Sequence, residues 1–424
     1  MMEDCDAARR GLVASVQRLR GPPFAMSDSS QFLFMTCQVG AEPTLKRELA
    51  KYRPSFRFAY SRPGFLTYKL PEKHGLKDDF ELHSVFARAY GFSLGKAEVA
   101  AAVANEAAPS PPAPLPEGAR GELAAQVWKL AEGRTFDALH VWPRDQRTPG
   151  EHGYEVGPTE ESRAVERLLR ETAPEAQAAL RTKKPTQKGD LVLDVVVTEP
   201  HQWWVGYHKA ASLVSRKPGG MFEEIELPYE AVSRAYLKTE EALRWSKLPL
   251  KKGDEAVEIG CAPGGSCQAL LKRGLFVTGI DPAEMHPAVF DHPQFRHLRM
   301  RGNDVKRREF RDVRWLTTDM NVAPNYTLDT VEDIVTHRDV DIEGMLLTLK
   351  LLDWKQADEI PQYISRVQSW GFDQVQCRQL QHNRREFCLA AHKSAAAHEH
   401  EDAEAAEERA ARKLAQLKKA KSKE

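Results

Sequence analysis

The chain lacks the features that would assign it at once to a membrane, secreted or zinc-binding class. Its sequence contains no apolar run near the roughly 18 residues that a transmembrane helix needs. No two cysteines form a Cys-x-x-Cys pair, so the pattern indicates neither a zinc site nor a disulfide framework. The cysteines are Cys5, Cys37, Cys261, Cys267, Cys377 and Cys388. Reduced thiols in a cytoplasmic protein without a bound metal are the simplest interpretation.

An excess of charge of one sign is also missing, because 61 Lys and Arg residues balance 61 Asp and Glu residues. A nucleic-acid partner would have to be recognised by local clusters of basic residues rather than by the net charge. Residues 1–25 include arginines but lack the continuous apolar core of a signal peptide. We expect this segment to be a disordered extension, or upstream sequence from a misplaced start.

A glycine-rich turn stands at the centre of the C-terminal half. A strand pattern over 256–259 runs into Gly260-Cys261-Ala262-Pro263-Gly264-Gly265, followed by a helix pattern and a second strand that ends at Asp281. This order predicts one βαβ unit of a Rossmann-like sheet. The turn is not Gly-x-Gly-x-x-Gly, and no Gly-Lys-Ser/Thr follows, which argues against dinucleotides and a phosphate-binding loop. An acid at 281 can accept both hydrogen bonds of a ribose diol, which favours a nucleoside ligand over a purely structural turn.

The N-terminal half predicts two small α+β modules. The first, over 26–97, follows the β-α-β-β-α-β order of a ferredoxin-like domain, with a second helix expected over 80–89. Residues 98–120 are rich in Ala and Pro and predict a semi-rigid linker. The second module, over 121–215, shows strand patterns at 136–142, 191–197 and 202–207 and helix patterns at 161–172 and 174–180.

Basic residues border the last two strands of the second module, beside Trp203 and Trp204. They are Lys183, Lys184, Lys188, Lys209 and Arg216. Basic groups beside an exposed tryptophan are typical of RNA binding. A solvated face with a core tryptophan fits the same pattern equally well.

The last domain, over 216–393, predicts an α/β fold in which the Rossmann-like sheet continues through five more strands. Their patterns lie at 295–299, 313–318, 344–350, 374–380 and 385–391, with helix patterns at 233–248 and 360–370. Residues 394–424 are a charged tail, to which we assign no function.

Four charged residues stand out in this domain. Lys238 lies on the helix before the glycine turn, Asp319 and Lys350 end two strands, and Glu386 lies in the last strand. Parallel strands present their carboxyl ends at one edge of the sheet, so Asp319 and Lys350 can converge there. Each residue alone is more typical of an ordinary surface group, such as a lysine that extends along apolar surface. Their joint placement around one cleft predicts a site.

The segment 233–393 resembles the FtsJ-type family of S-adenosylmethionine-dependent RNA 2′-O-methyltransferases, whose Lys-Asp-Lys-Glu tetrad is matched by these four residues. The wider chain, over about 30–393, resembles members of that class that methylate a cytidine ribose of large-subunit ribosomal RNA. Ser233-Arg234-Ala235-Tyr236-Leu237-Lys238-Thr239-Glu240-Glu241-Ala242 and the turn at 262–265 carry this second likeness. It implies that the module at 121–215 is a THUMP-like RNA-binding domain.

The resemblance also implies roles for single residues. Lys238, Asp319, Lys350 and Glu386 would be catalytic, with Lys350 either removing the proton of the 2′-hydroxyl or orienting that hydroxyl. S-adenosylmethionine would be bound by Ala235, Gly260, Ala262, Pro263, Gly264, Gly265, Asp281, Asp304 and Asp319. RNA would be the partner, and the arginine-rich segment 296–314 is either a track for it or a solvated face.

Two other functions remain as alternatives. A base methyltransferase acting on exocyclic amines usually carries Asn/Asp-Pro-Pro-Tyr/Phe, whereas this chain has Asp319-Met320-Asn321-Val322, and no cysteine stands at that strand end. An inactive RNA-binding assembly factor would be expected to lose the tetrad, which is intact. The chain departs from the family at Glu258, where the family has Asp, and over 327–341, an acidic stretch with no counterpart.

Overall fold

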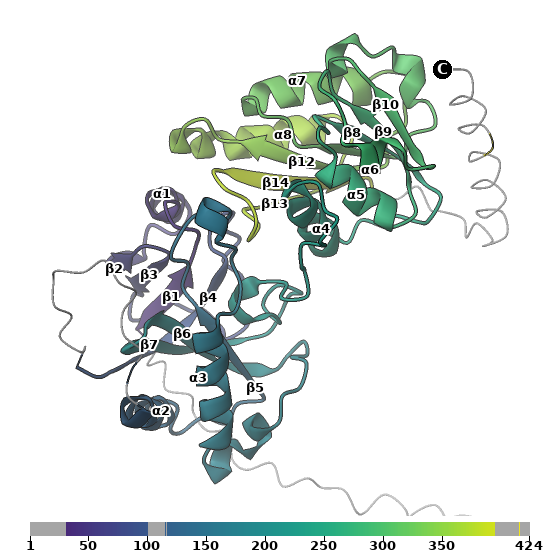
Figure 1. Ribbon diagram of the computed structural model, residues 1–424. Helices are drawn as coiled ribbons and strands as arrows, with labels where there is room; N and C mark the ends of the chain where they lie inside the picture. The colour runs from purple at the N-terminus through teal and green to yellow at the C-terminus, as the bar shows by residue number, and fades with distance from the viewer. Residues whose placement is uncertain (1–30, 101–114, 116, 395–414, 416–424) are drawn as a thin grey trace, which may run out of the picture.

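Two seven-stranded sheets organise the chain, and Figure 1 shows them in the lower and upper parts of the molecule. The computed structural model describes residues 31–100, 115, 117–394 and 415, so the segment 1–25 and nearly all of the tail lie outside the described residues. The strand orders are β2-β3-β1-β4-β7-β6-β5 and β10-β9-β8-β11-β12-β14-β13. Among the described residues, no helix is both long and apolar enough to cross a membrane.

The first sheet takes strands from both predicted N-terminal modules, because β4 of the first module pairs with β7 of the second. Its strands are β1 (Phe32–Thr36), β2 (Arg57–Arg62), β3 (Phe65–Lys69), β4 (Ala89–Glu98), β5 (Ala138–Pro143), β6 (Leu191–Glu199) and β7 (Gln202–Lys209). Its helices are α1 (Glu42–Tyr52), α2 (Glu117–Leu130), α3 (Glu160–Glu171) and the short η1 (Glu151–Gly153), η2 (Glu175–Arg181) and η3 (Pro218–Gly220). The linker predicted at 98–120 is thus partly helical, since α2 begins inside it.

The helix predicted over 80–89 is wrong, because this segment is irregular until β4 begins. Its backbone groups are satisfied by distant partners instead of by a helical turn. The Val85 N–H donates to the Glu48 carboxylate at 2.8 Å, and the Val85 carbonyl accepts from the Gln379 N–H at 2.8 Å. Phe86 is buried at 3% exposure, so tertiary contacts override the local helix preference.

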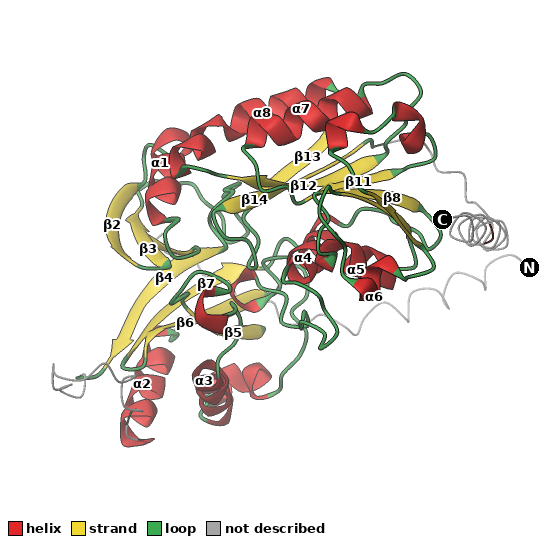
Figure 2. Cartoon of the chain, turned by 45° about the horizontal axis from the view of Figure 1, so that its top comes forward, coloured by secondary structure: helices red, strands yellow, loops and turns green. Residues whose placement is uncertain are grey.

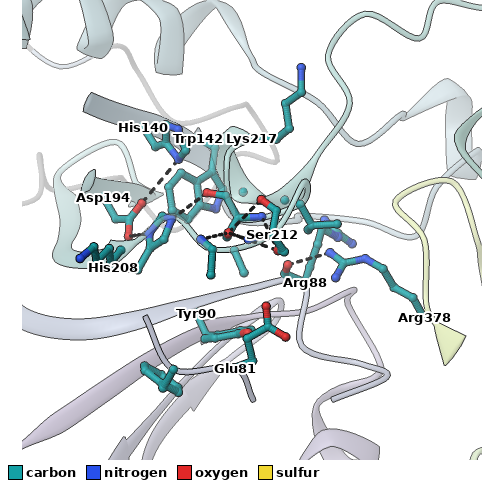
Figure 3. Close-up of a pocket in the computed structure, with 18 residues that line it drawn as sticks. Glu81, Arg88, Tyr90, His140, Trp142, Asp194, His208, Ser212, Lys217 and Arg378 are labelled. Atoms are coloured by element: carbon teal, nitrogen blue, oxygen red, sulfur yellow. Dashed lines mark hydrogen bonds and ion pairs between the residues drawn. The ribbon is translucent and has the colours of Figure 1, made fainter. Parts of the chain in front are cut away.

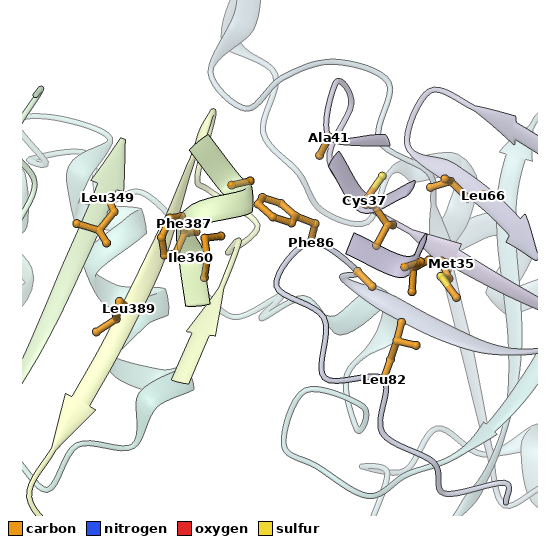
Figure 4. Packing of buried hydrophobic residues seen from close by; sticks show 14 of the residues in the cluster. Met35, Cys37, Ala41, Leu66, Leu82, Phe86, Leu349, Ile360, Phe387 and Leu389 are labelled. Carbon is orange, nitrogen blue, oxygen red and sulfur yellow. The ribbon is translucent and has the colours of Figure 1, made fainter. Parts of the chain in front are cut away.

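Phe86 joins the two halves of the molecule. Figure 4 shows it between residues of the first sheet, such as Met35 and Cys37, and residues of the second half, such as Ile360 and Phe387. All of these belong to one continuous hydrophobic cluster. Burial of a side chain of this size contributes about 1.5–3 kcal/mol, which favours a fixed contact between the two halves.

The second sheet forms an α/β domain, as the sequence predicts. Its strands are β8 (Glu255–Ile259), β9 (Phe276–Ile280), β10 (Phe295–Leu298), β11 (Trp315–Thr318), β12 (Gly344–Lys350), β13 (Gln374–Arg378) and β14 (Glu386–His392). Its helices are α4 (Ala235–Ser246), α5 (Gly265–Lys272), α6 (Pro287–Phe290), α7 (Pro324–Val335) and α8 (Ile360–Ser369), with short turns η4 (Gly302–Asp304), η5 (Arg307–Phe310) and η6 (Trp354–Glu359). Figure 2 shows α7 and α8 on one face and α4, α5 and α6 on the other.

The chain path in this sheet defines where a ligand can bind. Strands β10, β9, β8, β11 and β12 pair in parallel, and β14 is antiparallel to both β12 and β13. From β8 the chain builds outward through β9 and β10, then returns to the other side of β8 as β11. The carboxyl ends of β8 and β11 therefore flank the switch point, where open α/β sheets bind ligands.

A buried ion pair ties the start of β4 to the end of β5. Arg88 and Asp145 are 5% and 3% exposed, and the guanidinium donates two hydrogen bonds of 2.6 Å to the two carboxylate oxygens. Such a pair offers modest net stabilisation while intact, but removal of one partner leaves a buried charge without compensation.

We predict that Asp145→Asn lowers the free energy of unfolding by about 3–5 kcal/mol, because it strands the Arg88 charge. The measurement is the midpoint of urea unfolding. The control is Glu98→Gln, which breaks the exposed Lys96–Glu98 pair and should cost less than about 1 kcal/mol. Similar shifts for the two variants would show that the buried pair has no special weight.

Candidate active site

The four charged residues predicted from the sequence meet in one closed arrangement of alternating charge. Lys350 Nζ lies 2.6 Å from Asp319 Oδ1 and also contacts Glu386 Oε2. Lys238 Nζ lies 2.5 Å from Asp319 Oδ2 and 3.3 Å from Glu386 Oε1. Each lysine thus bridges both acids, and the formal charge of the group is zero.

The register of the second sheet brings these side chains together. Lys350 and Glu386 are direct partners across the antiparallel pair of β12 and β14. Asp319 directly follows β11, and its N–H donates to the carbonyl of Ile259 at the end of β8. Lys238 reaches the same edge from α4, which packs beside α5. The tetrad therefore lies at the switch point of the sheet.

Burial and neighbouring charges have opposite effects on the pKa values of Lys350 and Asp319. Burial alone would lower the pKa of Lys350, but the charges of Glu386 and Asp319 outweigh it and raise that pKa well above its ordinary value. Burial would raise the pKa of Asp319, but the charges of Lys238 and Lys350 outweigh it and lower that pKa. In this arrangement Lys350 is an ammonium group and Asp319 a carboxylate.

The glycine turn lies directly beside the tetrad. Gly260 has φ +82°, and a Cβ there would lie 2.8 Å from Met320 Cγ, next to Asp319. A Cβ on Gly265 would meet the hydroxyl of Ser233, which is buried with no hydrogen-bond partner among the described residues. Asp281 accepts from the backbone N–H groups of residues 262 and 283, which fixes its carboxylate at the end of β9. The turn is therefore a close-packed cradle of backbone.

Glu258 adds a neutral acid under the turn. It is 1% exposed, and its carboxyl contacts the hydroxyl of Thr317. The same hydroxyl also lies 3.1 Å from the carbonyl oxygen of Val257, so it can donate its one proton to either acceptor. Burial raises the pKa of Glu258 to about 8; the Thr317 hydrogen bond opposes this shift, and the charge of Asp319 adds to it.

The segment 379–385 between β13 and β14, which we term the docking loop, connects the tetrad to the first half of the chain. Glu241, one turn beyond Lys238 on α4, accepts hydrogen bonds from the backbone N–H groups of Gln381 and His382 at 2.9 and 3.1 Å. Asn383 is fully buried and its amide lies 3.4 Å from Glu386 Oε1. The loop is thus held against both α4 and the start of β14.

The first half of the chain holds the docking loop from the other side. Glu155 binds Arg234 Nη2 at 2.7 Å and His382 Nδ1 at 3.2 Å, and Arg384 Nε donates to the carbonyl of Pro149 at 2.8 Å. Burial opposes ionisation of Glu155, but its hydrogen bonds to Arg234 and His382 lower its pKa to about 2. The sequence predictions missed this loop. The signal was a run of polar residues directly before a strand that carries a candidate catalytic acid.

Other predicted site residues lie around this centre. Ala235 begins α4 beside the glycine turn, since the backbone of Tyr236 approaches Gly265. Asp304 is exposed in η4, and Gly302 of the same turn packs on Ile259 at the end of β8. Asp304 therefore lies near the carboxyl end of β8 and is exposed to solvent.

The structure bears on the two features for which the sequence left RNA binding and an ordinary structural role as alternatives. Trp203 is fully buried, which agrees with the core-tryptophan alternative, and Trp204 packs on Phe65 and donates to the hydroxyl of Ser93. Much of the arginine-rich segment 296–314 is paired with acids of its own surface. The pairs are Arg296–Glu309, Arg299–Glu284, Arg307–Asp333, Arg308–Glu309, Arg314–Asp254 and Arg314–Glu343. These pairs favour the solvated-face interpretation for that segment.

We predict that Glu258→Gln removes a pH dependence of stability. The folded protein holds a proton on Glu258 up to about pH 8, whereas the unfolded chain releases it near the ordinary carboxyl pKa of about 4.3. The wild type therefore loses stability as pH rises through this window, by an amount on the order of a few kcal/mol. The glutamine variant should keep its stability there, because it is neutral at every pH.

The measurement compares urea midpoints of wild type and variant at pH 5 and pH 8. The variant's advantage should appear mainly at pH 8. Glu132→Gln, which changes an exposed carboxylate, serves as the matched control. Parallel pH profiles for wild type and Glu258→Gln would mean that Glu258 is ionised in the folded protein.

Comparison with known proteins places a family match on the same region. Residues 231–378 match the family model described as FtsJ-like methyltransferase. The matched segment contains Lys238, Asp319 and Lys350, and it ends before Glu386.

Curated relatives named "Ribosomal RNA large subunit methyltransferase M" also match. The protein of Aeromonas salmonicida (strain A449) is 30% identical over 177 residues, which cover 39% of this chain and 48% of the relative. That of Salmonella agona (strain SL483) is 27% identical over 279 residues, which cover 59% of this chain and 74% of the relative. The chain spans about half the length of the first curated relatives it matches.

Among solved structures, TrmN from Thermus thermophilus is 14% identical with a TM-score of 0.31, covering 85% of this chain and 99% of that chain. The fibrillarin pre-rRNA processing protein of Methanococcus jannaschii is 12% identical with a TM-score of 0.29, covering 37% of this chain and 76% of that chain. The segment that matches the FtsJ-like methyltransferase family model holds the glycine turn and three of the four tetrad residues.

Proposed function

We propose that the protein transfers a methyl group from S-adenosylmethionine to a ribose 2′-hydroxyl in RNA, with a cytidine of large-subunit ribosomal RNA as the target. The observation that carries this proposal is the closed Lys-Asp-Lys-Glu arrangement beside a glycine cradle at the switch point of the sheet. The family match and the names of the curated relatives support the same chemistry.

The residues around the turn fit the proposed cofactor. The glycines leave space that a Cβ would fill, the buried Ser233 hydroxyl has no partner among the described residues, and Asp281 keeps acceptor capacity for a ribose diol. The residues that would hold it are Ala235, Gly260, Ala262, Pro263, Gly264, Gly265, Asp281, Asp304 and Asp319. When bound, S-adenosylmethionine supplies an electrophilic methyl group.

The tetrad would act on the acceptor hydroxyl. The Lys350 ammonium can donate a hydrogen bond to the hydroxyl oxygen, orient it and stabilise the negative charge that develops on it. Lys350 can remove the hydroxyl proton only after its own proton has left, because Glu386 and Asp319 keep it charged. The two roles differ in their pH–rate profiles: a base gives a rate that rises with pH, and an orienting ammonium gives a rate that falls once the ammonium titrates.

RNA would be bound mainly by the first half of the chain. The exposed lysines Lys184 and Lys188 of the β5–β7 region are available for phosphate contacts, whereas Lys183 pairs with Glu166 at 3.2 Å. The docking loop and Glu155 connect this half directly to α4 and β14. RNA held on the first sheet would therefore be positioned relative to Lys238 and Glu386.

We predict that Lys350→Ala lowers methyl transfer by about 10²–10⁴-fold while S-adenosylmethionine binding is retained, because the lysine acts on the acceptor rather than on the methyl donor. The assay is transfer of a labelled methyl group to large-subunit ribosomal RNA. Nuclease digestion then distinguishes ribose methylation, which protects the adjacent phosphodiester bond, from base methylation.

The control for this variant is Lys355→Ala, which removes an exposed lysine near the same strand end and should leave transfer unchanged. Full turnover by Lys350→Ala would sink the assignment. A label on a base, or transfer only to proteins or small molecules, would remove the proposed 2′-O chemistry.

We predict that Gly260→Ala weakens S-adenosylmethionine binding by at least about tenfold, because left-handed backbone costs an alanine roughly 1–2 kcal/mol and relief of that strain moves the turn away from the conformation that would hold the cofactor. In addition, the new methyl group would lie 2.8 Å from Met320 Cγ and 2.9 Å from Met320 Cα, so the turn must shift. Isothermal titration calorimetry with the cofactor is the measurement. Gly157→Ala is the control, since nothing lies within 4 Å of its Cβ position. Equal affinities of the two variants would place the cofactor elsewhere.

A further inference from the structure

Three side chains with metal-binding atoms meet on neighbouring strands of the first sheet, away from the tetrad. They are His140 on β5, Asp194 on β6 and His208 on β7, with exposures of 2%, 0% and 9%. His140 and Asp194 are direct partners in the β5–β6 pair, and His208 lies two residues beyond Gly206, the β7 partner of Asp194. Side chains two apart on a strand share a face, so all three point the same way (Figure 3).

The outer nitrogens of both histidines are bonded to oxygen atoms. His208 Nε2 lies 2.7 Å from the carbonyl oxygen of Ser215, and His140 Nε2 lies 2.9 Å from the hydroxyl of Thr186. A carbonyl oxygen only accepts, so His208 Nε2 must carry hydrogen. A proton on His140 Nε2 would satisfy Thr186 in the same way. If both rings are neutral, both Nδ1 atoms then present lone pairs toward Asp194.

With both rings neutral and protonated on Nε2, no proton lies between the Nδ1 atoms and the Asp194 carboxylate. His208 Nδ1 lies 2.6 Å from Asp194 Oδ2, a contact that needs either a second proton on His208 or a bound cation. His140 Nδ1 and Asp194 Oδ1 are 3.8 Å apart, and both are buried without a hydrogen-bond partner among the described residues. A cation between the three side chains would satisfy all of these atoms at once.

We propose that His140, Asp194 and His208 bind a divalent transition-metal ion, with Zn²⁺ as the ion this donor set fits best. Imidazole nitrogens and a carboxylate oxygen are usual zinc ligands, and the ligand atoms of this group all lie within 4.8 Å of one another. Tetrahedral binding at zinc distances needs ligand atoms about 3.3 Å apart, so the 2.6 Å contact would open by about 0.7 Å and the 3.8 Å gap would close by about 0.5 Å.

The surroundings have the form of a supported metal site. Ligating histidines usually donate their second N–H to a carbonyl or hydroxyl group, which is the role that Ser215 and Thr186 have here. The three side chains also line a cavity of about 60 Å³, which leaves room for water as a fourth ligand. Two cations of the cavity wall are already paired, Arg88 with Asp145 and Lys217 with Glu224.

A metal at this position would be structural. It would join β5, β6 and β7 and, through Ser215, the segment that leads from β7 into the second half of the chain. The sequence prediction of no metal rested on cysteine spacing, and it could not register two histidines and an aspartate on three strands. The metal proposal does not depend on the proposed methyl transfer.

The test uses the full chain, purified without a polyhistidine tag, and Zn²⁺ as the probe. Metal analysis of the purified protein, or of protein stripped with a chelator and dialysed against zinc, should show about one zinc per chain. Substitution with Co²⁺ should give the visible absorption of a four-coordinate N/O site. The chelator should also lower the thermal midpoint of the wild type, because a metal that binds only the folded state stabilises it.

Variants assign the metal to this site. Asp194→Asn and His140→Ala should reduce zinc to below about 0.1 per chain, and Thr186→Val, which only removes a supporting contact, should weaken zinc affinity about 10–100-fold. His201→Ala, in the turn between β6 and β7, is the matched control and should keep the full zinc content. If His140→Ala does not fold, Thr186→Val and the stripped wild type still decide the question. Wild-type protein that takes up no zinc, or zinc that stays on folded Asp194→Asn, would overturn the proposal.

Discussion

The alternating ion pairs of Lys238, Asp319, Lys350 and Glu386 constrain the whole second half of the molecule. Four mostly buried charges are tolerated only when each faces opposite charge on both sides. That condition requires the starts of α4 and β14 and the ends of β11 and β12 to meet at one point. The parallel pairing of β8 with β11 and the antiparallel pairing of β12 with β14 meet the condition, and they place the glycine turn beside it.

The same constraint reaches the first half of the chain through the docking loop. Glu241 holds the loop's backbone from α4, while Glu155 holds both Arg234 and His382 from the N-terminal side. Because Arg234 lies four residues before Lys238, and His382 lies four residues before Glu386, both fixed points adjoin tetrad residues. Two members of the tetrad are thus positioned partly by the first half. Residues 216–393, if separated from that half, would lose these supports.

The sequence predicted local features well and remote ones poorly. The β8–α5–β9 unit and the bounds of β12 follow from short apolar runs and glycines, and the convergence of Asp319 and Lys350 follows from strand ends in a parallel sheet. Lys238 and Glu386 were added by the family resemblance. The helix expected at 80–89 failed because Glu48 and Gln379, both distant in sequence, take its backbone hydrogen bonds. The docking loop showed only a run of polar residues before a strand, and the start of α2 lies inside an Ala/Pro-rich stretch whose composition predicted a linker. The His140–Asp194–His208 group has no local pattern, because sheet register brings its members together.

Two acids at adjacent strand ends differ in charge because their surroundings differ. Asp319 faces two ammonium groups, which lower its pKa, whereas Glu258 faces a hydroxyl in a dry environment, and burial raises its pKa to about 8. If Glu258 were ionised, its charge would add to that of Asp319 and strengthen the hold of the acids on the lysine protons. When Glu258 is neutral, the two negative charges of Asp319 and Glu386 balance the two positive charges of Lys238 and Lys350. With Glu258 neutral, Asp319 and Glu386 are the acids that hold the proton on Lys350, and the same two acids close the ring of ion pairs.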